Sequence, residues 1–140
     1  KQGVLFVLDV DSFKKINDTM GHAFGDEVLR NLAVRLQSMF RATDIVGRTG
    51  GDEFMVFLKD IRDITMIERE GKKIEQFFHQ FEVGEYVKYS VTASVGAAVF
   101  PGDGRTFENL YKSADNALYV SKRHGKNQLT FYKKPEKETT

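Results

Sequence analysis

Five consecutive apolar residues, Val4 to Leu8, are followed directly by an acidic residue, Asp9. A short apolar run without the polar alternation of a half-exposed strand is typical of a strand that is covered on both faces. Such a strand lies in the middle of a sheet that has helices packed on it. The run therefore predicts the central strand of an α/β domain.

The rest of the chain carries helix and strand patterns in turn. We expect Asp11 and Ser12 to cap a short helix, and the Gly21 to Gly25 segment to form a turn before Asp26 opens a long helix. Apolar spacing and alternation predict the remaining elements. In order, they are a strand at 4–8, helices at 13–18 and 26–40, strands at 45–49 and 54–58, a helix at 67–81, a strand at 91–99, a helix at 107–118 and a strand at 128–132. This order predicts an α/β domain with a mixed sheet.

A pair of glycines, Gly50 and Gly51, separates two of these strands. Glycine takes positive φ angles without steric cost, and a tight two-residue turn between antiparallel strands needs such angles. The pair therefore predicts a β-hairpin.

Length and composition limit the class of protein. A chain of 140 residues suits one compact domain, which we expect at 1–133, followed by a flexible polar tail at 134–140. Its 21 lysines and arginines nearly balance its 20 aspartates and glutamates, so neither nucleic acid nor membrane contact is expected of this domain. Cysteine is absent, which excludes disulfides and thiolate metal sites. We expect a cytoplasmic domain cut from a longer protein, with a sensor or membrane domain possible upstream.

Two acidic clusters stand next to the predicted strands. Asp9 and Asp11 follow the first strand, and Asp52 and Glu53 follow the glycine pair. If the first strand pairs beside the hairpin, the clusters converge, and carboxylates so close together suit Mg²⁺ or Mn²⁺ that bridges substrate phosphates. The alternative is structural: Asp11 caps a helix, and Asp52 and Glu53 are solvated turn residues.

Two lysines, Lys122 and Lys126, lie at the end of the last predicted helix. No P-loop sequence occurs in the chain, so phosphates would have to be held by groups such as these. The alternative is that the lysines complement the helix dipole and that Gly125 ends the helix in a left-handed conformation.

Four ordered motifs make the chain resemble the GGDEF family of diguanylate cyclases. They are Arg48 to Phe54, which reads R-T-G-G-D-E-F; Asp9 to Asp18 with Gly21, His22, Gly25 and Asp26 after it; Ser94 to Gly96; and Ala114 to Asn127. The resemblance covers residues 4 to 132. It implies a central mixed β-sheet surrounded by helices, with the ferredoxin-like core of nucleotidyl cyclases and polymerase palms and the hairpin at the active site.

The resemblance also implies roles for individual residues. Asp52 and Glu53 would be catalytic, and two Mg²⁺ or Mn²⁺ ions per active site would be held by Asp9, Asp52 and the Val10 carbonyl, with Glu53 beside them. Asn17 and Asp26 would bind guanine. The remaining nucleotide contacts would come from Phe13, Lys14, Gly50, Gly51, Lys122 and Lys126. Two positions depart from the family: Lys126 stands where arginine is common, and Thr49 where an aromatic residue is common.

A further family motif, R-x-x-D, matches Arg41 and Asp44. In the family this motif binds the product, cyclic di-GMP, away from the active site and inhibits the enzyme. Lys73 is a further candidate contact. As a bare pattern the motif is weak, and the alternative is a solvated helix end.

The implied reaction joins two GTP molecules into cyclic di-GMP plus two pyrophosphates at the interface of two identical domains. Each 3′-hydroxyl would attack the α-phosphate of the other GTP. One alternative is a catalytically silent module that binds GTP or cyclic di-GMP, and another is a polymerase fragment, against which the near-neutral charge counts.

Overall fold

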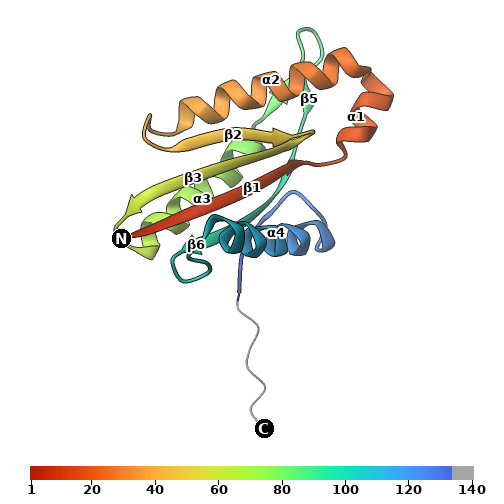
Figure 1. The fold of residues 1–140 in the computed structure, drawn as a ribbon. Helices are drawn as coiled ribbons and strands as arrows, with labels where there is room; N and C mark the ends of the chain where they lie inside the picture. The colour runs from red at the N-terminus through yellow and green to blue at the C-terminus, as the bar shows by residue number, and fades with distance from the viewer. Residues whose placement is uncertain (134–140) are drawn as a thin grey trace.

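The computed structural model describes residues 1–133, and the predicted tail at 134–140 lies outside them. A five-stranded sheet runs through the domain in the order β2-β3-β1-β6-β7 (Figure 1). The elements are β1 Gln2–Val10, α1 Phe13–Met20, α2 His22–Met39, β2 Ile45–Gly50, β3 Glu53–Ile61, α3 Ile64–His79, β4 Glu82–Val83, β5 Tyr89–Ser90, β6 Ala93–Phe100, α4 Phe107–Arg123 and β7 Leu129–Phe131. The predicted α/β fold with a mixed sheet is confirmed.

The apolar run that begins the chain forms the centre of the sheet. β1 pairs antiparallel with β3 on one side and with β6 on the other. β2 pairs antiparallel with β3 in the predicted hairpin, and β7 pairs parallel with β6. Because β1 lies between the hairpin and β6, its end is held beside the hairpin turn.

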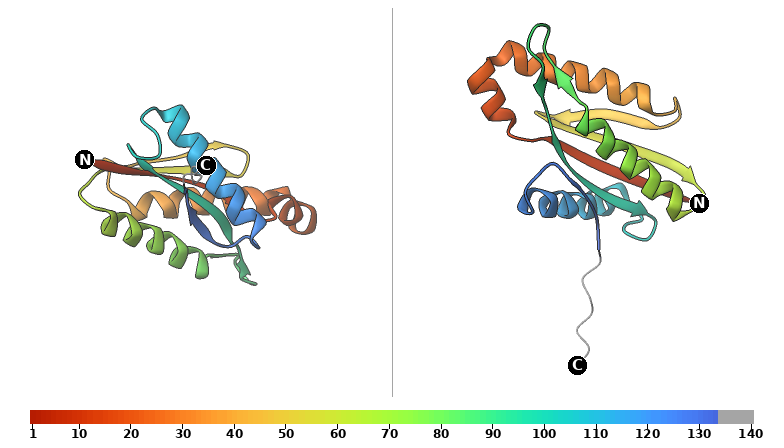
Figure 2. Two further views of the ribbon diagram at one scale, coloured as in Figure 1. Left: turned by 90° about the horizontal axis from the view of Figure 1, so that it is seen from below. Right: turned by 180° about the vertical axis from the view of Figure 1, so that it is seen from behind.

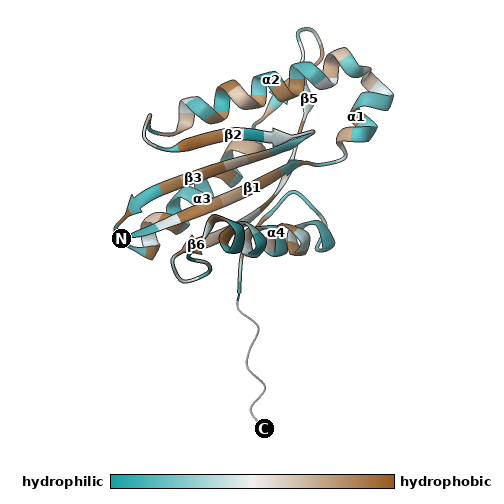
Figure 3. Ribbon diagram, viewed as in Figure 1, coloured by the Kyte–Doolittle hydropathy of each residue, from teal (hydrophilic) through white to brown (hydrophobic). Residues whose placement is uncertain are grey.

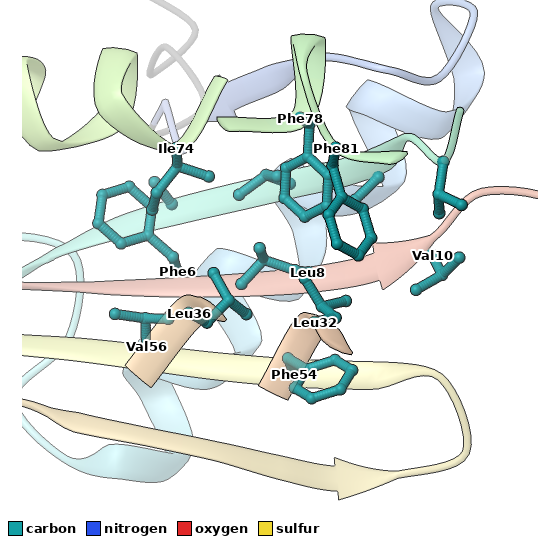
Figure 4. Close-up of a cluster of buried hydrophobic side chains, with 14 of the residues drawn as sticks. Phe6, Leu8, Val10, Leu32, Leu36, Phe54, Val56, Ile74, Phe78 and Phe81 are labelled. Atoms are coloured by element: carbon teal, nitrogen blue, oxygen red, sulfur yellow. The ribbon is translucent and has the colours of Figure 1, made fainter. Parts of the chain in front are cut away.

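Helices cover both faces of the sheet (Figure 2). α2 and α3 cover one face, where Phe6, Leu8, Leu32, Phe54 and Ile74 belong to the larger buried cluster (Figure 4). α4 covers the other face over a smaller cluster built on Leu5, Val7, Leu110, Ala114 and Leu118. Figure 3 shows the corresponding pattern, with apolar residues along β1 and β3 and mixed polarity along the helices.

The backbone of α4 comes very close to β6 at Gly96. A Cβ atom on Gly96 would lie 2.1 Å from the carbonyl oxygen of Ala114 and 2.2 Å from the nitrogen of Leu118. Only glycine permits this approach, because real Cβ contacts essentially never fall below 3.0 Å. The close packing places the C-terminal end of α4 beside the end of β1.

Several local predictions were wrong. Gly25 lies inside α2, which begins at His22, so the chain does not turn between Gly21 and Gly25; only Gly21 breaks the helix. Ser12 stands at the N-cap of α1 in the left-handed region with φ 54°, but no side chain caps this helix.

The region of α3 also differs from the prediction. α3 begins earlier, because Asp63 caps it by accepting from the Met66 amide at 3.1 Å. It ends at His79, so Phe81 lies beyond the helix, where the unpredicted β4 and β5 form a small two-stranded sheet. Among the described residues, no helix is long and apolar enough to cross a membrane.

Candidate active site

The two acidic clusters meet at one end of the sheet. In Figure 1 the C-terminal end of β1 and the β2–β3 turn lie at the same end of the sheet, next to α1. Asp9 is the cross-strand partner of Glu53, and the Val10 amide donates to the Asp52 carbonyl at 3.2 Å. The expected convergence is therefore present, because β1 pairs directly with the second strand of the hairpin.

Both glycines of the turn take positive φ angles, 152° at Gly50 and 49° at Gly51. Arg48 closes the turn by donating from Nε to the Gly51 carbonyl at 2.7 Å. Both glycines are exposed, and no Cβ on either would meet another atom within 4 Å. The turn thus presents backbone without side chains at this end of the sheet, which allows a ligand to approach closely.

The carboxylates carry an unfavourable charge balance among themselves. Burial raises the pKa of Asp52, and the charges of Asp9 and Glu53 raise it further. Lys122, from the last turn of α4, relieves part of this repulsion through a hydrogen-bonded ion pair with Asp9. Partial burial lowers the pKa of Lys122, but the hydrogen bond to Asp9 and the nearby carboxylates outweigh burial, so the pKa is raised.

The oxygen ligands at this end of the sheet fit a hard divalent cation. Asp9, Asp52 and the Val10 carbonyl offer the oxygen ligands that Mg²⁺ and Mn²⁺ prefer. Burial is the main cause of the raised Asp52 pKa, and a cation would offset the repulsion from Asp9 and Glu53 that adds to it. Within residues 1–133, no three acidic or histidine side chains are already grouped around one point. A metal would therefore need phosphate oxygens or water as further ligands, as is usual for Mg²⁺.

Glu53 is held in a different way from Asp9 and Asp52. Its carboxylate accepts from the Tyr111 hydroxyl at 3.0 and 3.1 Å and from the Thr49 hydroxyl at 2.6 Å. Burial and the Glu53 carboxylate raise the pKa of Tyr111 to about 12, so this phenol is a hydrogen donor at neutral pH. Glu53 is thus tied both to its own hairpin and to α4.

The candidate guanine residues lie where α1 and α2 meet. Asn17, on α1, is half-buried, and Asp26, in the second turn of α2, is exposed. A Cβ on Gly25 would lie only 1.9 Å from the Asn17 Oδ1 atom and 3.3 Å from the Phe13 ring. The buried glycine therefore gives Asn17 the space that it occupies, which the prediction of a turn at this position had missed.

The remaining residues predicted to contact the nucleotide flank the same end of the sheet. Phe13 and Lys14 begin α1, with Phe13 packed on the core and Lys14 exposed. Lys126 follows α4 with φ 63° and donates from Nζ to the Ser12 hydroxyl at 3.3 Å. Gly125 follows the end of α4 with φ 108°, which agrees with the alternative given for this glycine, that it ends the helix.

Asp11 does not cap α1 as expected. Its carboxylate accepts from the hydroxyls of Thr92 at 2.7 Å and Ser94 at 2.6 Å, and from the Asn127 amide at 2.9 Å. These bonds join the end of β1 to β6 and to the loop after α4. Asp11 is therefore a structural anchor behind the site.

The predicted inhibitory residues gather at the opposite end of β2. Arg41 binds both Asp44 oxygens, from Nε at 3.1 Å and from a terminal nitrogen at 2.9 Å. Lys73 donates to the Met39 carbonyl at 2.9 Å and lies 5.3 Å from the centre of the Phe40 ring. These residues line a cavity of about 190 Å³, whose wall also includes Leu58 and Ile61 of β3. Six residues of β2 separate this cavity from Gly51, a span of roughly 20 Å.

Two contributors to the site were missed by sequence reasoning. Tyr111 lies in the helix predicted at 107–118 and was given no role there, and Thr49 was noted only as a departure from the family. A polar tip on an apolar stripe was the available signal, because a buried tyrosine hydroxyl usually has a partner. The partner, 58 residues away, could not be identified without the fold.

Comparisons with known proteins agree with this geometry. The family model described as "Diguanylate cyclase, GGDEF domain" matches residues 1–128. Diguanylate cyclase DosC of Escherichia coli is 38% identical over 132 residues, which cover 92% of this chain and 28% of DosC. The chain thus spans little more than a quarter of that relative.

Solved structures of similar domains match almost the whole chain. The GGDEF domain of YfiN from Pseudomonas aeruginosa has a TM-score of 0.89 at 32% identity, covering 96% of this chain and 84% of that one. The GGDEF domain of DgcB from Caulobacter crescentus, solved in complex with c-di-GMP, has a TM-score of 0.74 at 30% identity, with coverages of 93% and 77%.

Proposed function

The chain belongs to the GGDEF family of diguanylate cyclase domains, and we propose that it forms half of an active site that condenses two GTP into cyclic di-GMP. The observation that carries this proposal is the register of β1 against the hairpin, which places Asp9 opposite Glu53 and Val10 against Asp52. These groups lie at the open end of the sheet, beside the exposed Gly50–Gly51 backbone.

The reaction needs two copies of the domain. Each copy presents one GTP, and the 3′-hydroxyl of each nucleotide attacks the α-phosphate of the other. Each attack forms one bond from the 3′-oxygen to phosphorus, breaks the bond from that phosphorus to its bridging oxygen, and releases one pyrophosphate and the hydroxyl proton. A site at the open end of the sheet suits this arrangement, because a second copy can complete and close it.

Divalent cations would be held by Asp9, Asp52 and the Val10 carbonyl, with Glu53 beside them. Mg²⁺ or Mn²⁺ would supply a lower pKa for the attacking hydroxyl and neutralise charge on the phosphates. The role of Asp9 and Asp52 is to keep two negative charges fixed at the end of β1 and at the turn. Burial raises the pKa of Asp52 and repulsion from Asp9 adds to this, so a cation between the two carboxylates would be attracted to the pair.

The nucleotide would be held by residues on both sides of this end of the sheet. Asn17 and Asp26 offer the mixed donor and acceptor set that the guanine base requires, and Gly25 keeps the space for Asn17 open. Lys122 and Lys126, with Phe13, Lys14 and the backbone of Gly50 and Gly51, would contact the phosphates. Lys122 would exchange its present bond to Asp9 for one to phosphate when a cation takes its place.

Product inhibition would act through the cavity beside Arg41. The Arg41 fork and the Asp44 carboxylate can bind phosphate and guanine edges respectively, and Lys73 lies on the wall of the same cavity. Lys73 is already engaged with Met39 and Phe40, so its contribution would be to keep the segment that carries Arg41 in place.

The test is product analysis by liquid chromatography after incubation of concentrated protein with GTP and Mg²⁺, with Asp52→Ala in parallel. Cyclic di-GMP from the parent and not from the variant, with the variant's fold intact by circular dichroism, would support the proposal. Substantial synthesis by Asp52→Ala would refute the site. If the parent makes no product even when two copies are fused, the silent binding module would replace the enzyme.

A further inference from the structure

We propose that Glu70 on α3 is a specificity-determining residue of the cavity beside Arg41, where its carboxylate accepts hydrogens from the N1–H and 2-amino groups of a guanine. The inference rests on the proposed function, because the ligand is the cyclic di-GMP that would inhibit the enzyme at this cavity. Arg41 keeps its contact with phosphate and Asp44 its contact with guanine, and Glu70 adds the choice of base.

Glu70 lies on the wall of this cavity together with its neighbours on α3. Met66, Glu70 and Lys73 are spaced by four and three residues, so they lie on one side of the helix, and all three line the cavity. The pKa of Arg41 is raised mainly by its bond to Asp44 and also by the charge of Glu70. Glu70 therefore faces the same space as the paired Arg41 and Asp44 side chains.

One oxygen of Glu70 is buried and has no hydrogen-bond partner. Within residues 1–133, its Oε2 atom is the only buried side-chain oxygen or nitrogen of which this is true. Lys73 Nζ lies 3.8 Å from this oxygen, too far for a hydrogen bond, and donates to the Met39 carbonyl at 2.9 Å instead. Leaving a buried oxygen unpaired costs free energy, so a ligand that donates to it gains affinity.

Asp44 has too few free acceptor positions to bind a whole guanine edge. Its side chain is only 3% exposed, and it already accepts from the backbone amide, from Nε and from a terminal nitrogen of Arg41. A carboxylate offers about four lone-pair positions, so about one remains. Guanine presents N1–H and its 2-amino group side by side, and binding both needs further acceptors. Glu70 supplies them from another wall of the same cavity.

The rest of the cavity favours a flat base, and not a phosphate, at Glu70. Leu58 and Ile61 are buried and form an apolar wall, and a carboxylate repels phosphate. Asp60 also lines the cavity, but it is exposed, so water can satisfy its carboxylate. The volume of about 190 Å³ is smaller than the roughly 300 Å³ at which complete small-molecule pockets begin, so the cavity suits one part of a ligand, such as a base.

The same chemistry distinguishes one purine from another. Adenine has an acceptor at N1, which a carboxylate repels. Hypoxanthine keeps N1–H but lacks the 2-amino group, so one of the two hydrogen bonds to Glu70 is lost. Hydrogen bonds to a charged acceptor are strong, and each lost bond lowers affinity measurably. Glu70 therefore makes the cavity select guanine.

The experiment measures binding of cyclic di-GMP by isothermal titration calorimetry to the parent, Glu70→Gln, Glu68→Gln and Arg41→Ala. Glu70→Gln keeps the size of the side chain but replaces one acceptor with a donor. Glu68→Gln is the matched control, because Glu68 is an exposed residue of the same helix that does not line the cavity. Arg41→Ala defines the binding that belongs to the cavity. Each protein is also titrated with the inosine analogue of cyclic di-GMP and with a non-hydrolysable GTP analogue.

We expect Glu70→Gln to raise the Kd for cyclic di-GMP by about tenfold or more, the loss of a hydrogen bond to a charged group. The parent should bind the inosine analogue about tenfold more weakly than cyclic di-GMP. In Glu70→Gln this ratio should shrink by at least about threefold, because the acceptor for the 2-amino group is gone. The Kd for the GTP analogue should stay within about twofold of the parent value, and Glu68→Gln should bind every ligand as the parent does.

Binding of cyclic di-GMP by Glu70→Gln within about twofold of the parent would overturn the inference, as would an unchanged ratio between the two dinucleotides. If Arg41→Ala binds cyclic di-GMP as tightly as the parent, the inhibitory cavity is itself wrong, and the role of Glu70 falls with it. Failure of the parent to synthesise cyclic di-GMP would refute the proposed enzyme, and it is measured by turnover, separately from these titrations.

Discussion

Gly25 offers a perturbation that separates the function of the site from the stability of the domain. The residue lies in α2 with ordinary helical geometry, and it is buried against Asn17. In Gly25→Ala, the new Cβ would stand 1.9 Å from Asn17 Oδ1, where ordinary contacts begin at 3.4 Å. The amide must therefore retreat by about 1.5 Å, the difference of these two distances.

The two effects of this substitution on the domain have opposite signs. Alanine in place of glycine inside a helix contributes about 1 kcal/mol of stability, whereas rotating the Asn17 side chain and pressing the Phe13 ring at 3.3 Å costs a similar amount. We expect the free energy of unfolding to change by less than about 1 kcal/mol. The displaced amide would lose two hydrogen bonds to guanine, about 2 kcal/mol or roughly thirtyfold in Kd for GTP.

The assay is urea unfolding combined with titration of a fluorescent GTP derivative in Mg²⁺. Gly71→Ala is the matched control, because Gly71 is a buried helical glycine in α3 whose new Cβ would have the Phe131 ring as its nearest neighbour, at 3.3 Å. This control should bind GTP as the parent does. Nucleotide binding by Gly25→Ala within about twofold of the parent would refute the role given to Asn17.

Three further predictions concern other parts of the domain. Arg41→Ala should leave the initial rate of cyclic di-GMP synthesis unchanged and remove the slowing that follows product accumulation; a progress curve that still bends as in the parent would contradict this. Burial raises the pKa of Asp52, so its ionised form destabilises the fold increasingly as the pH rises through that raised pKa, and not below the pKa of a free aspartate. In a chelator, Asp52→Asn should therefore gain stability over the parent from acidic to neutral pH in urea unfolding, and a pH-independent difference would refute the argument. Phe54→Ala removes a side chain that is 1% exposed at the start of β3, and it should lower the free energy of unfolding by about 3 to 5 kcal/mol, measurable as a large fall in Tm.

Elements with a strong local signal were predicted well. The apolar run of β1 and the glycine pair of the hairpin both act within a few residues, so their patterns are visible without the fold. The weaker predictions depended on what a neighbour contributes. Gly25 was read as part of a turn, but it lies in α2. A glycine stands there because Asn17 occupies the volume that a side chain would take.

The candidate site shows the same division. Carboxylates at a strand end and at a glycine turn are visible as sequence, and their meeting follows once β1 pairs with β3. The partners that hold them could not be inferred, because Lys122 lies 113 residues from Asp9 and Tyr111 lies 58 residues from Glu53. Asp11 had the pattern of a helix cap. In the fold its carboxylate instead accepts from Thr92 and Ser94 and from the loop after α4, which are distant in sequence.

The sequence by itself determined the α/β class, the hairpin with its positive φ angles, and the acids at the end of the first strand, because these depend on side-chain polarity and backbone sterics over short distances. Tertiary structure decided that Asp9 pairs with Lys122, that Glu53 in the hairpin accepts from Tyr111, and that Asp11 anchors the end of β1. That choice rests on the packing of α4 against Gly96 and on the strand register, and both arise only when distant segments are brought into contact.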